Sequence, residues 1–417
     1  MSPISRRNFF QFASSILATL GISQLKFLSQ AENYGKVLAQ STPRKLALLV
    51  GINKYKKSPL RGCVNDTEMQ RHLLIHRFGF NPKDIYIITD EQATRQGILE
   101  AFEEHLIKQA KPGDVAVFHY SGHGSRVKDP NPIVKTSLMD GSGLSGTLVP
   151  VDSSLPQGYP NVGGTVNDIM GHTLFLLTSA LKTDNFTGIL DSCFSGITTR
   201  DFTVRSRAGG EKIEIVSQEK VYQEKWLSRL NISEEEFVKG YQSGVAKGIF
   251  FASAKPLQTA KDVKILDFHA GIFSYLFTLY LWQETATPEE AIAYVNRQIP
   301  ARLKQNPLYE VKTGTKLDSQ AIYLTENSSP VANAVVTEIK GDKAQIWLGG
   351  LDVKKIAELT TGAIFNVVNS KEKSAAKLIF ESRDGLLGTA TVKGKSIVKP
   401  GSLLDLSGKE GVGNRGK

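Results

Sequence analysis

After Pro43 the sequence alternates between short apolar runs and stretches with a helical spacing of apolar residues, and this alternation restricts the fold more than any other feature. Residues 46–52 form a continuous apolar run, which is typical of a strand buried on both faces. Helical spacing follows over 65–78 and again over 94–110. Because parallel strands need crossover helices, the pattern predicts an α/β fold, a mostly parallel sheet with helices on both faces. Further elements are predicted as strands over 85–89, 115–120 and 186–190 and as a helix over 166–181.

Residues 199–247 interrupt this alternation, because they are polar and rich in Lys, Arg, Glu and Ser. We expect them to form an exposed insertion with one helix near 233–241. The alternation resumes at 248–253 and predicts a last strand over 321–324. The α/β domain is therefore expected to extend over 44–327.

Beyond residue 330 the pattern changes to short β-like runs separated by turns that contain glycine. This change predicts a small all-β, barrel-like domain over 331–407. We expect residues 408–417 to be a disordered tail. The predicted strands lie at 334–339, 343–348, 363–368, 377–382 and 387–392.

Residues 1–39 have the features of a bacterial twin-arginine export signal, since Arg6 and Arg7 precede a weakly apolar stretch. The alternative is an amphipathic N-terminal helix. Polar residues interrupt the stretch, and no apolar run in the chain reaches the roughly 18 residues that a bilayer span needs. We therefore expect export by the twin-arginine route to the periplasmic space, with no stable membrane anchoring after the signal is removed.

Charge and cysteine content narrow the possible classes. The 417 residues include 51 Lys and Arg against 41 Asp and Glu, a net charge of +10, and the basic residues are spread along the chain rather than gathered in a block. We therefore favour a basic enzyme over a nucleic-acid-binding protein, and expect no nucleic acid as a partner. Cys63 and Cys193 are too few for a disulfide scaffold or a four-thiolate zinc site.

Two of the predicted strands end in residues that can carry chemistry. The strand over 115–120 is followed by His123 between two glycines, and the strand over 186–190 is followed by Cys193 in a turn with Ser and Gly. If both strands lie in one sheet, the imidazole and the thiol emerge at the same rim, where such sheets bind ligands. A neighbouring imidazole takes the proton of a thiol and makes it a nucleophile. Each residue alone would more simply be structural, but the pairing favours catalysis.

The motifs around these residues resemble those of a known family. Tyr-Ser-Gly-His-Gly at 120–124, Asp-Ser-Cys-Phe-Ser-Gly at 191–196 and Gly-Cys-Val-Asn-Asp at 62–66 resemble the metacaspases, in particular the bacterial members often called orthocaspases. The resemblance covers about 45–325 and implies a caspase-like fold there. It does not include the β-domain.

The resemblance implies roles for three residues at the strand ends. Cys193 would be the nucleophile, and His123 would be the general base that later protonates the leaving amine. The backbone N–H groups of Cys193 and Gly124 would stabilise the oxyanion of the tetrahedral intermediate. The Gln-Ala-Cys-x-Gly signature of true caspases is missing, which argues against cleavage after aspartate.

The resemblance also implies an acidic specificity pocket. A partly desolvated pair of carboxylates selects an arginine or lysine, so we expect protein or peptide substrates with exposed Arg or Lys as partners. The alternative for Asp66 is a carboxylate in the first turn of a helix, where it interacts favourably with the helix dipole. The residues that match the pocket are Cys63, Asp66, Ser121 and Asp191.

Many eukaryotic metacaspases need calcium, and the resemblance identifies weak candidates for such a site in Asp152, Asp168 and Asp201. The family pattern has an aspartate where this chain has Asn167, and another where it has Arg200. Calcium prefers six to eight oxygen ligands, and an arginine at the site repels it. We therefore expect activity without calcium and no required cofactor; the competing expectation is that Asp201 takes the missing position by a one-residue shift.

Together these features predict a cysteine endopeptidase that cuts after Arg or Lys through a Cys-His dyad. A second interpretation is a catalytically silent caspase-like scaffold or signalling protein that binds a partner through its β-domain, and a third is another Cys-His hydrolase such as an amidase. We expect a monomer.

Such an enzyme could also cut itself in the basic insertion, for which the alternative is a solvated loop. Basic residues there include Arg200, Arg205, Arg207, Lys212, Lys220, Lys225, Arg229 and Lys239.

Overall fold

The structure of the chain is a computed structural model that describes residues 43–129, 143–194, 203–324, 330–368, 376–394 and 397–409. From Arg44 onward the described residues pack as one compact unit. The expected export signal over 1–39 and residues 410–417 of the expected tail lie outside the described residues. In the part of the chain that is described, no helix is both long and apolar enough to cross a membrane.

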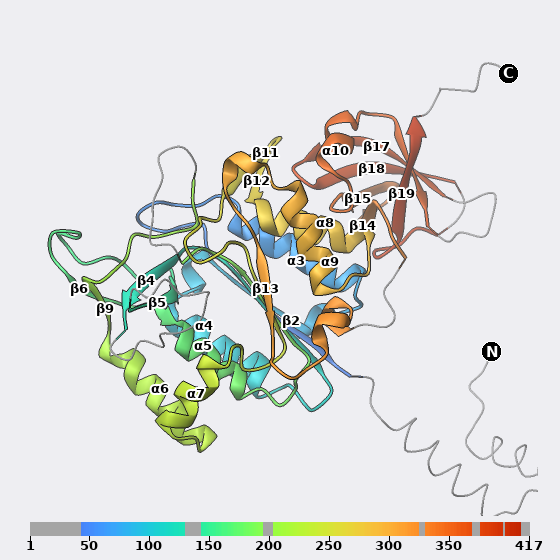
Figure 1. Cartoon of the computed structure of the whole chain (residues 1–417). Coiled ribbons are helices and arrows are strands. Elements are labelled where there is room, and N and C mark those ends of the chain that lie inside the picture. The colour runs from blue at the N-terminus through green and yellow to red at the C-terminus, as the bar shows by residue number, and fades with distance from the viewer. Residues whose placement is uncertain are drawn as a thin grey trace, which may run out of the picture. The chain divides into compact units, whose positions relative to one another are not determined.

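A six-stranded sheet with the strand order β13-β10-β8-β3-β1-β2 forms the centre of the α/β part (Figure 1). Its strands are parallel except for β13, which is antiparallel to β10 at one edge. The predicted α/β fold with a mostly parallel sheet is confirmed. The bounds are Lys45–Gly51 for β1, Ile85–Thr89 for β2, Val115–Ser121 for β3, Phe186–Asp191 for β8, Ile249–Ala252 for β10 and Leu308–Val311 for β13.

The last strand of this sheet is not where the sequence predicts it. Residues 322–324 form a 3-10 turn in which Tyr323 has a φ of 62°, a value that a strand does not accommodate. The ring of Tyr323 is buried against Phe78, and its hydroxyl accepts a hydrogen bond from Gln70. The short apolar run is therefore an anchor in the core, and β13 takes the edge of the sheet instead.

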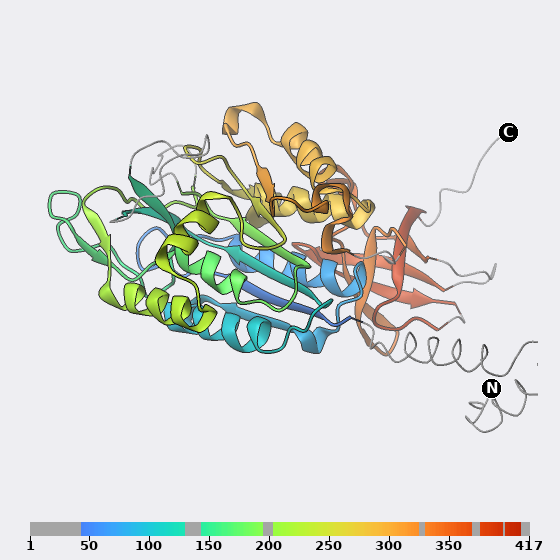
Figure 2. The same ribbon diagram turned by 60° about the horizontal axis from the view of Figure 1, so that its bottom comes forward.

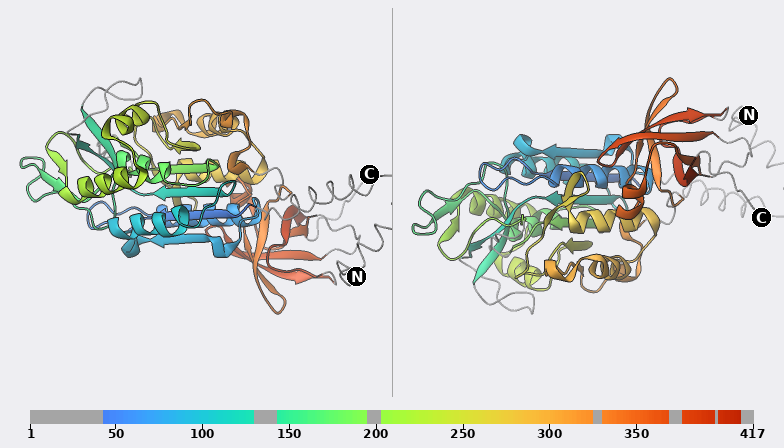
Figure 3. Two further views of the ribbon diagram at one scale, coloured as in Figure 1. Left: turned by 90° about the horizontal axis from the view of Figure 1, so that it is seen from below. Right: turned by 90° about the horizontal axis from the view of Figure 1, so that it is seen from above.

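Helices cover both faces of the sheet (Figures 2 and 3). Alternate residues of β1 point to opposite sides, since Ala47 and Leu49 belong to one hydrophobic cluster whereas Leu48 and Val50 belong to another. The first cluster includes residues of α3 Cys63–His76, α8 Ile272–Gln283 and α9 Pro288–Gln298, and the second includes residues of α4 Arg95–Ala101 and α5 Gly171–Ser179.

Two of the predicted helices differ in detail from the structure. The helix expected over 94–110 is α4 followed by a π-helical segment, Phe102–Ile107. The helix expected from residue 166 begins only at Gly171, because short strands precede it. The short strands near the rim of the sheet are β4 Gly124–Lys128, β5 Leu144–Leu148, β6 Gly164–Val166, β7 Ile169–Met170, β9 Ile213–Ile215, β11 Asp262–Ile265 and β12 Phe268–Gly271.

Residues 203–247, the described part of the expected exposed insertion, are exposed at many positions and buried at a few. Two helices form there instead of one, α6 Ser217–Leu230 and α7 Glu234–Gln242. The side chains of Trp226 and Phe237 on these helices are buried in the same cluster as α5. The few apolar residues of this polar segment are thus enough to hold it on the sheet domain.

Charged residues of the segment are buried as well, and each of them has a partner of opposite charge. Glu219 is fully buried and pairs with Arg95. Arg205 is fully buried and pairs with Asp66. A prediction from composition assigns such residues to the surface, because the burial of an unpaired charge is energetically unfavourable. A charged side chain with an ion-pair partner and hydrogen bonds can nevertheless be buried.

The C-terminal part is a closed antiparallel barrel with the strand order β14-β15-β18-β17-β16-β19, which confirms the predicted all-β, barrel-like fold (Figure 1). Its last strand extends to Lys409, two residues into the tail that was expected to be disordered. The bounds are Ala334–Lys340 for β14, Lys343–Trp347 for β15, Ala363–Val367 for β16, Lys377–Asp384 for β17, Leu387–Lys393 for β18 and Leu403–Lys409 for β19, with a short helix α10 at Val353–Glu358.

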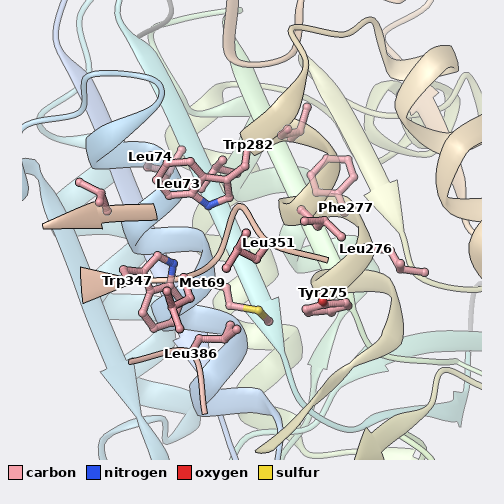
Figure 4. Close-up of a cluster of buried hydrophobic side chains, with 14 of the residues drawn as sticks. Met69, Leu73, Leu74, Tyr275, Leu276, Phe277, Trp282, Trp347, Leu351 and Leu386 are labelled. Atoms are coloured by element: carbon pink, nitrogen blue, oxygen red, sulfur yellow. The ribbon is translucent and has the colours of Figure 1, made fainter. Parts of the chain in front are cut away.

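The barrel and the α/β part share one hydrophobic cluster (Figure 4). Trp347 and Leu386 of the barrel side lie in this cluster together with Met69 of α3 and Leu276 of α8. The ring of Trp347 also stacks on the ring of His72, with 4.3 Å between the ring centroids. The barrel therefore supports α3, the helix whose first turn carries Cys63 and Asp66.

Candidate active site

The ends of β3 and β8 bring the predicted catalytic residues to one rim of the sheet. The two strands are parallel neighbours, and their register pairs Ser121 with Asp191. His123 and Cys193 each follow two residues after this pair, and both are buried. The backbones approach so closely that a Cβ added to Gly124 would lie 2.5 Å from the carbonyl oxygen of Cys193, so only glycine fits there.

Two residues of the loop after β1 fix the orientation of His123. The Nε2 atom of His123 lies 2.7 Å from the carbonyl oxygen of Ser58. A carbonyl only accepts hydrogen bonds, so Nε2 carries the proton and Nδ1 has a free lone pair. Within the described residues Nδ1 is buried and has no hydrogen-bond partner. The backbone N–H of His123 donates to the hydroxyl of Tyr55 over 2.9 Å, and the Tyr55 ring lies against the imidazole.

The electrostatic surroundings keep the His123 imidazole neutral at neutral pH. Burial is the main reason that the pKa of His123 is lowered to about 4. The hydrogen bond to Ser58 opposes this change, whereas the nearby guanidinium groups of Arg207 and Arg205 add to it. A neutral imidazole with an unpaired ring nitrogen is the form that can take a proton from a thiol.

The four residues predicted to line the specificity pocket lie together and are fully buried. Cys63 and Asp66 come from the first turn of α3, Ser121 from the end of β3 and Asp191 from the end of β8. Ser121 Oγ donates to Asp66 Oδ2 over 2.7 Å, and the hydroxyl of Ser274 donates to Asp191 Oδ2 over 2.7 Å. Burial raises the pKa of the Cys63 thiol, so this cysteine stays protonated and is not a nucleophile.

A third carboxylate, Asp262, belongs to the pocket and was not predicted from the sequence. It lies on the hairpin of β11 and β12, and its Oδ2 accepts hydrogen bonds from the backbone N–H groups of Arg61 (2.7 Å) and Gly62 (3.2 Å). No motif surrounds Asp262 in the sequence. Only the packing of the hairpin against the first turn of α3 brings it to the pocket.

The guanidinium of Arg205, from the chain itself, fills this acidic pocket. Its NH1 lies 2.6 Å from Asp66 Oδ2 and 3.0 Å from Asp191 Oδ2, and its NH2 lies 3.4 Å from Asp262 Oδ1. Burial lowers the pKa of Arg205, but the carboxylates outweigh it and the pKa is raised. For the carboxyl group of Asp66, burial has the opposite effect and raises the pKa to about 7, although the positive charge of Arg205 opposes this shift.

The backbone of Arg205 is also held by hydrogen bonds. Its carbonyl oxygen accepts a hydrogen bond from the N–H of Cys193 and another from the N–H of Gly124, both over 3.0 Å. Its N–H donates to the carbonyl of Ala260 over 2.9 Å, and the N–H of Asp262 donates to the carbonyl of Thr203 over 3.0 Å. Residues 203–205 therefore lie along the β11 segment like an added antiparallel strand.

After Arg205 the chain continues in a second extended stretch. Ser206 forms a parallel bridge with Gly124, and the N–H of Arg207 donates to the carbonyl of Gly124 over 2.8 Å. The bond between Arg205 and Ser206 thus lies beside the two N–H groups at the strand ends. No local pattern distinguishes Arg205 from the other basic residues of its segment.

The two calcium candidates that the structure describes, Asp152 and Asp168, each accept hydrogen bonds from other residues of the chain. Asp152 accepts hydrogen bonds from the N–H of Arg95 and from the side chain of Asn167, and Asp168 accepts one from a guanidinium nitrogen of Arg207 over 2.6 Å. Asp201 lies outside the described residues. Across the described ranges no group of three or more His, Cys, Asp or Glu side chains could hold a metal ion. Activity without calcium remains a prediction.

Cys63 and Cys193 are not joined by a disulfide. The pocket tolerates no extra bulk at Gly271, where an added Cβ would lie 2.5 Å from Arg205 NH1. Together, the site holds a thiol, an imidazole with a fixed tautomer, two N–H groups that donate to one carbonyl oxygen, and an acidic pocket that a guanidinium occupies. A thiol, an imidazole and a pair of N–H donors are groups that can serve acyl transfer.

A comparison with family models matches residues 45–201 to the metacaspase, peptidase C14 domain. The matched segment includes His123 and Cys193 and most of the pocket, but neither Arg205 nor the barrel. The match therefore covers the strands β3 and β8, whose ends carry His123 and Cys193.

Curated relatives agree with this match over the same part of the chain. Metacaspase-1 of Sclerotinia sclerotiorum is 35% identical over 176 residues, which are 40% of this chain and 36% of that protein. Metacaspase-1 of Meyerozyma guilliermondii is 37% identical over 171 residues, 38% of this chain and 37% of that protein. The chain thus spans little more than a third of the length of these relatives. A solved structure, protein GSU0716 from Geobacter sulfurreducens, aligns with a TM-score of 0.45 and 17% identity over 66% of this chain and 96% of that one.

Proposed function

We propose, from the premise that residues 45–201 are a peptidase domain of the metacaspase C14 family, that the chain is a cysteine endopeptidase that cuts after Arg or Lys. One observation supports this more than any other. The side chain of Arg205 occupies the acidic pocket while its carbonyl oxygen accepts hydrogen bonds from the N–H groups of Cys193 and Gly124. A substrate arginine before a scissile bond would need the same two sets of contacts.

In the proposed reaction, His123 Nδ1 takes the proton of the Cys193 thiol, and the thiolate sulfur attacks the carbonyl carbon. The carbonyl becomes an oxyanion, held by the N–H groups of Cys193 and Gly124, and each such donor contributes about 3 kcal/mol to transition-state stabilisation. The C–N bond then breaks, and the imidazolium gives its proton to the leaving amine. Water attacks the carbonyl carbon of the resulting thioester, and His123 takes the proton of that water. The C–S bond then breaks, the acid product leaves, and the imidazolium returns its proton to the thiolate of Cys193. Ser58 acts as a positioning residue, because its carbonyl holds Nε2–H and so presents Nδ1.

The pocket supports a preference for arginine over lysine. Asp66 and Asp191 both contact NH1 of Arg205, whereas Asp262 faces NH2. A lysine has a single nitrogen and would reach the first pair but not Asp262 as well. A neutral or acidic side chain would leave buried carboxylates without a counterion, which is strongly unfavourable.

The same contacts support self-processing at one bond, between Arg205 and Ser206. Of the basic residues between 203 and 247, the described part of the segment, Arg205 is the one that the pocket holds. The uncut chain would therefore be its own first substrate, and Arg205 would exclude other substrates until the segment leaves.

The test uses the full chain, a Cys193→Ala variant and an Arg205→Gln variant. We expect the wild type to give a new N-terminus at Ser206 by N-terminal sequencing, and both variants to stay intact at that bond. The wild type should hydrolyse a Val-Arg coumarin amide, more slowly a Val-Lys amide, and not a Val-Asp amide. Cys193→Ala should reduce the hydrolysis by about a thousandfold or more.

The outcomes separate the competing functions. If no peptide is hydrolysed by any processed form, the chain is a silent scaffold. If hydrolysis does not depend on a basic residue before the cut, the chain is another Cys-His hydrolase. If Cys193→Ala is fragmented like the wild type, the cut at Ser206 comes from another protease.

A further inference from the structure

We infer that Asp168 is a second specificity site, which binds a basic residue two positions after the scissile bond. This inference rests on the proposed function, because it takes the Arg205–Ser206 bond as the bond that is cut. Arg207 is then the second residue on the leaving side, and the structure shows what holds it. The substrate class becomes a peptide with Arg, any residue, and then Arg or Lys.

The backbone on the leaving side is bound as an added strand. Ser206 bridges Gly124, and Gly210 bridges Val127, both in parallel orientation, so residues 206–210 follow β4. The N–H of Arg207 donates to the carbonyl of Gly124 over 2.8 Å, and the N–H of Gly210 donates to the carbonyl of Arg126 over 3.0 Å. These contacts use only main-chain atoms, so they are available to any extended peptide.

The side chain of Arg207 is bound at a prepared acidic position. Its NH2 lies 2.6 Å from Asp168 Oδ2, and its NH1 donates to Ser153 Oγ over 3.1 Å. Asp168 is fully buried, and its two oxygens also accept hydrogen bonds from the hydroxyls of Thr147 and Ser153, each over 2.6 Å. The carboxylate is thus oriented by groups that do not belong to the bound segment.

The charge balance of this position favours a cation. Among the described residues the only ion pair of Asp168 is with Arg207. If Arg207 leaves, a fully buried carboxylate keeps two neutral hydroxyl donors but loses its counterion, which is costly. A substrate that supplies a guanidinium or an ammonium restores the pair, whereas a glutamine supplies only a neutral donor.

The segment that begins at Ser206 remains attached to the rest of the chain through β9 and α6, so after a cut Arg207 competes with substrates for Asp168. An enzyme with Arg207→Gln removes this competitor. Because Arg207 follows the scissile bond, Arg205 and its pocket are unchanged in sequence in this variant.

The experiment measures kcat and KM of processed Arg207→Gln enzyme on internally quenched peptides Val-Arg-Ser-Xaa, in which Xaa is Arg, Lys or Gln. We expect kcat/KM to be about tenfold higher with Arg or Lys than with Gln, mainly through KM. The same peptides on an Asp168→Asn, Arg207→Gln enzyme form the matched control, and there the ratio should fall to about one.

A Val-Arg coumarin amide, which has no residues after the cut, is the reference for each enzyme and tests the proposed function separately. If this amide is hydrolysed but the Arg and Gln peptides differ by less than twofold on the enzyme that keeps Asp168, the inference is overturned and the Arg207–Asp168 pair only holds the uncut segment in place. This comparison of peptides needs no folded Asp168 variant. An unchanged ratio in the Asp168→Asn enzyme would also overturn the assignment to Asp168.

Discussion

At the rim of the sheet, His123 donates Nε2–H to the carbonyl of Ser58, and its Nδ1 has no hydrogen-bond partner among the described residues. Burial is the largest cause of its lowered pKa of about 4, and Arg207 and Arg205 lower it further. Both guanidiniums belong to the segment that fills the site. The protonation of the base is therefore tied to whether that segment is in place.

Under the proposed function, this dependence predicts different pH profiles for self-cleavage and for hydrolysis of an added substrate. A base loses activity as the pH falls through its pKa, so self-cleavage of the uncut chain should persist down to about pH 4. Once the cut segment leaves, His123 is more hydrated and has lost two nearby cations, so its pKa rises towards the ordinary value of about 6.5. Hydrolysis of a coumarin amide by the processed enzyme should then fall off at a higher pH.

The check is to follow self-cleavage by gel and kcat/KM by fluorescence over the same buffers from pH 3.5 to about 8, a range chosen to span both values. A Cys193→Ala chain at each pH corrects for cleavage by acid or by contaminants. Acid limbs that coincide within about half a unit would contradict the link between the segment and the base.

The sequence predicts some of these residues and not others, for physical reasons. His123 and Cys193 follow strands whose pairing the α/β pattern implies, and the structure brings their ends together. Ser58 acts through its backbone carbonyl, which every type of residue has, so the sequence does not reveal this contact. Asp262 depends on a long-range contact of a hairpin, which no local pattern encodes.

Among the elements, α6 is attached to the sheet domain by a buried charge. Glu219 in its first turn is fully buried, accepts hydrogen bonds from the N–H of Met170 and the hydroxyl of Thr173, and pairs with Arg95. Since α6 follows the segment whose Arg205 occupies the acidic pocket, this attachment fixes one end of that segment.

We predict that Arg95→Ala destabilises the chain by about 3–5 kcal/mol, because it leaves a buried carboxylate without its counterion. The matched control is Arg229→Ala. Arg229 lies on the same helix α6 as Glu219 and pairs with Glu103 at the surface, where such a pair contributes about 0–1 kcal/mol. Urea denaturation of the Cys193→Ala background measures both changes, and equal losses in the two variants would contradict a buried anchor.

Composition could not predict that α6 packs on the sheet domain. A prediction from composition assigns charged residues such as Glu219 to the surface, whether or not the fold supplies an ion-pair partner. The helix around 233–241 was predicted from its pattern, and the structure has α7 there. The helix α6 was missed, since only Trp226 on it is a buried apolar residue and Glu219 is a buried polar one. Pairing across the fold, rather than hydropathy, decides where this segment lies.

Over the whole molecule, the barrel and the α/β part are joined by a continuous core. Trp347 stacks on His72 of α3, and Leu386 lies in the cluster that also holds Leu73. Because α3 carries pocket residues in its first turn, the barrel stabilises the pocket indirectly.

We predict that Trp347→Ala lowers the free energy of unfolding by about 3–5 kcal/mol, as expected for a large buried aromatic residue. Ile397→Ala is the matched control in the same domain, since Ile397 is 90% exposed and its loss should change stability by less than about 0.5 kcal/mol. Differential scanning calorimetry should give one transition for the barrel and the α/β part. Two separate transitions in the unaltered chain would show that the shared core does not couple them.

The barrel fold itself was predictable, because alternating short runs and glycine turns are local signals. Its closing strand β19 was not among the five predicted runs, because it contains few apolar residues. This strand is held in the barrel by its pairing with β14 and β16. The contact between Trp347 and His72 was not predictable either, since neither side chain differs in the sequence from an ordinary core residue.

The placement of Arg205 in the pocket has one further consequence. Because this arginine and the thiol belong to the same polypeptide, their encounter is unimolecular, and dilution does not slow it. Under the proposed cleavage, maturation would follow first-order kinetics, with a half-time independent of how many copies a compartment contains. The rate constant of maturation would be the same in dilute and in concentrated solutions of the protein.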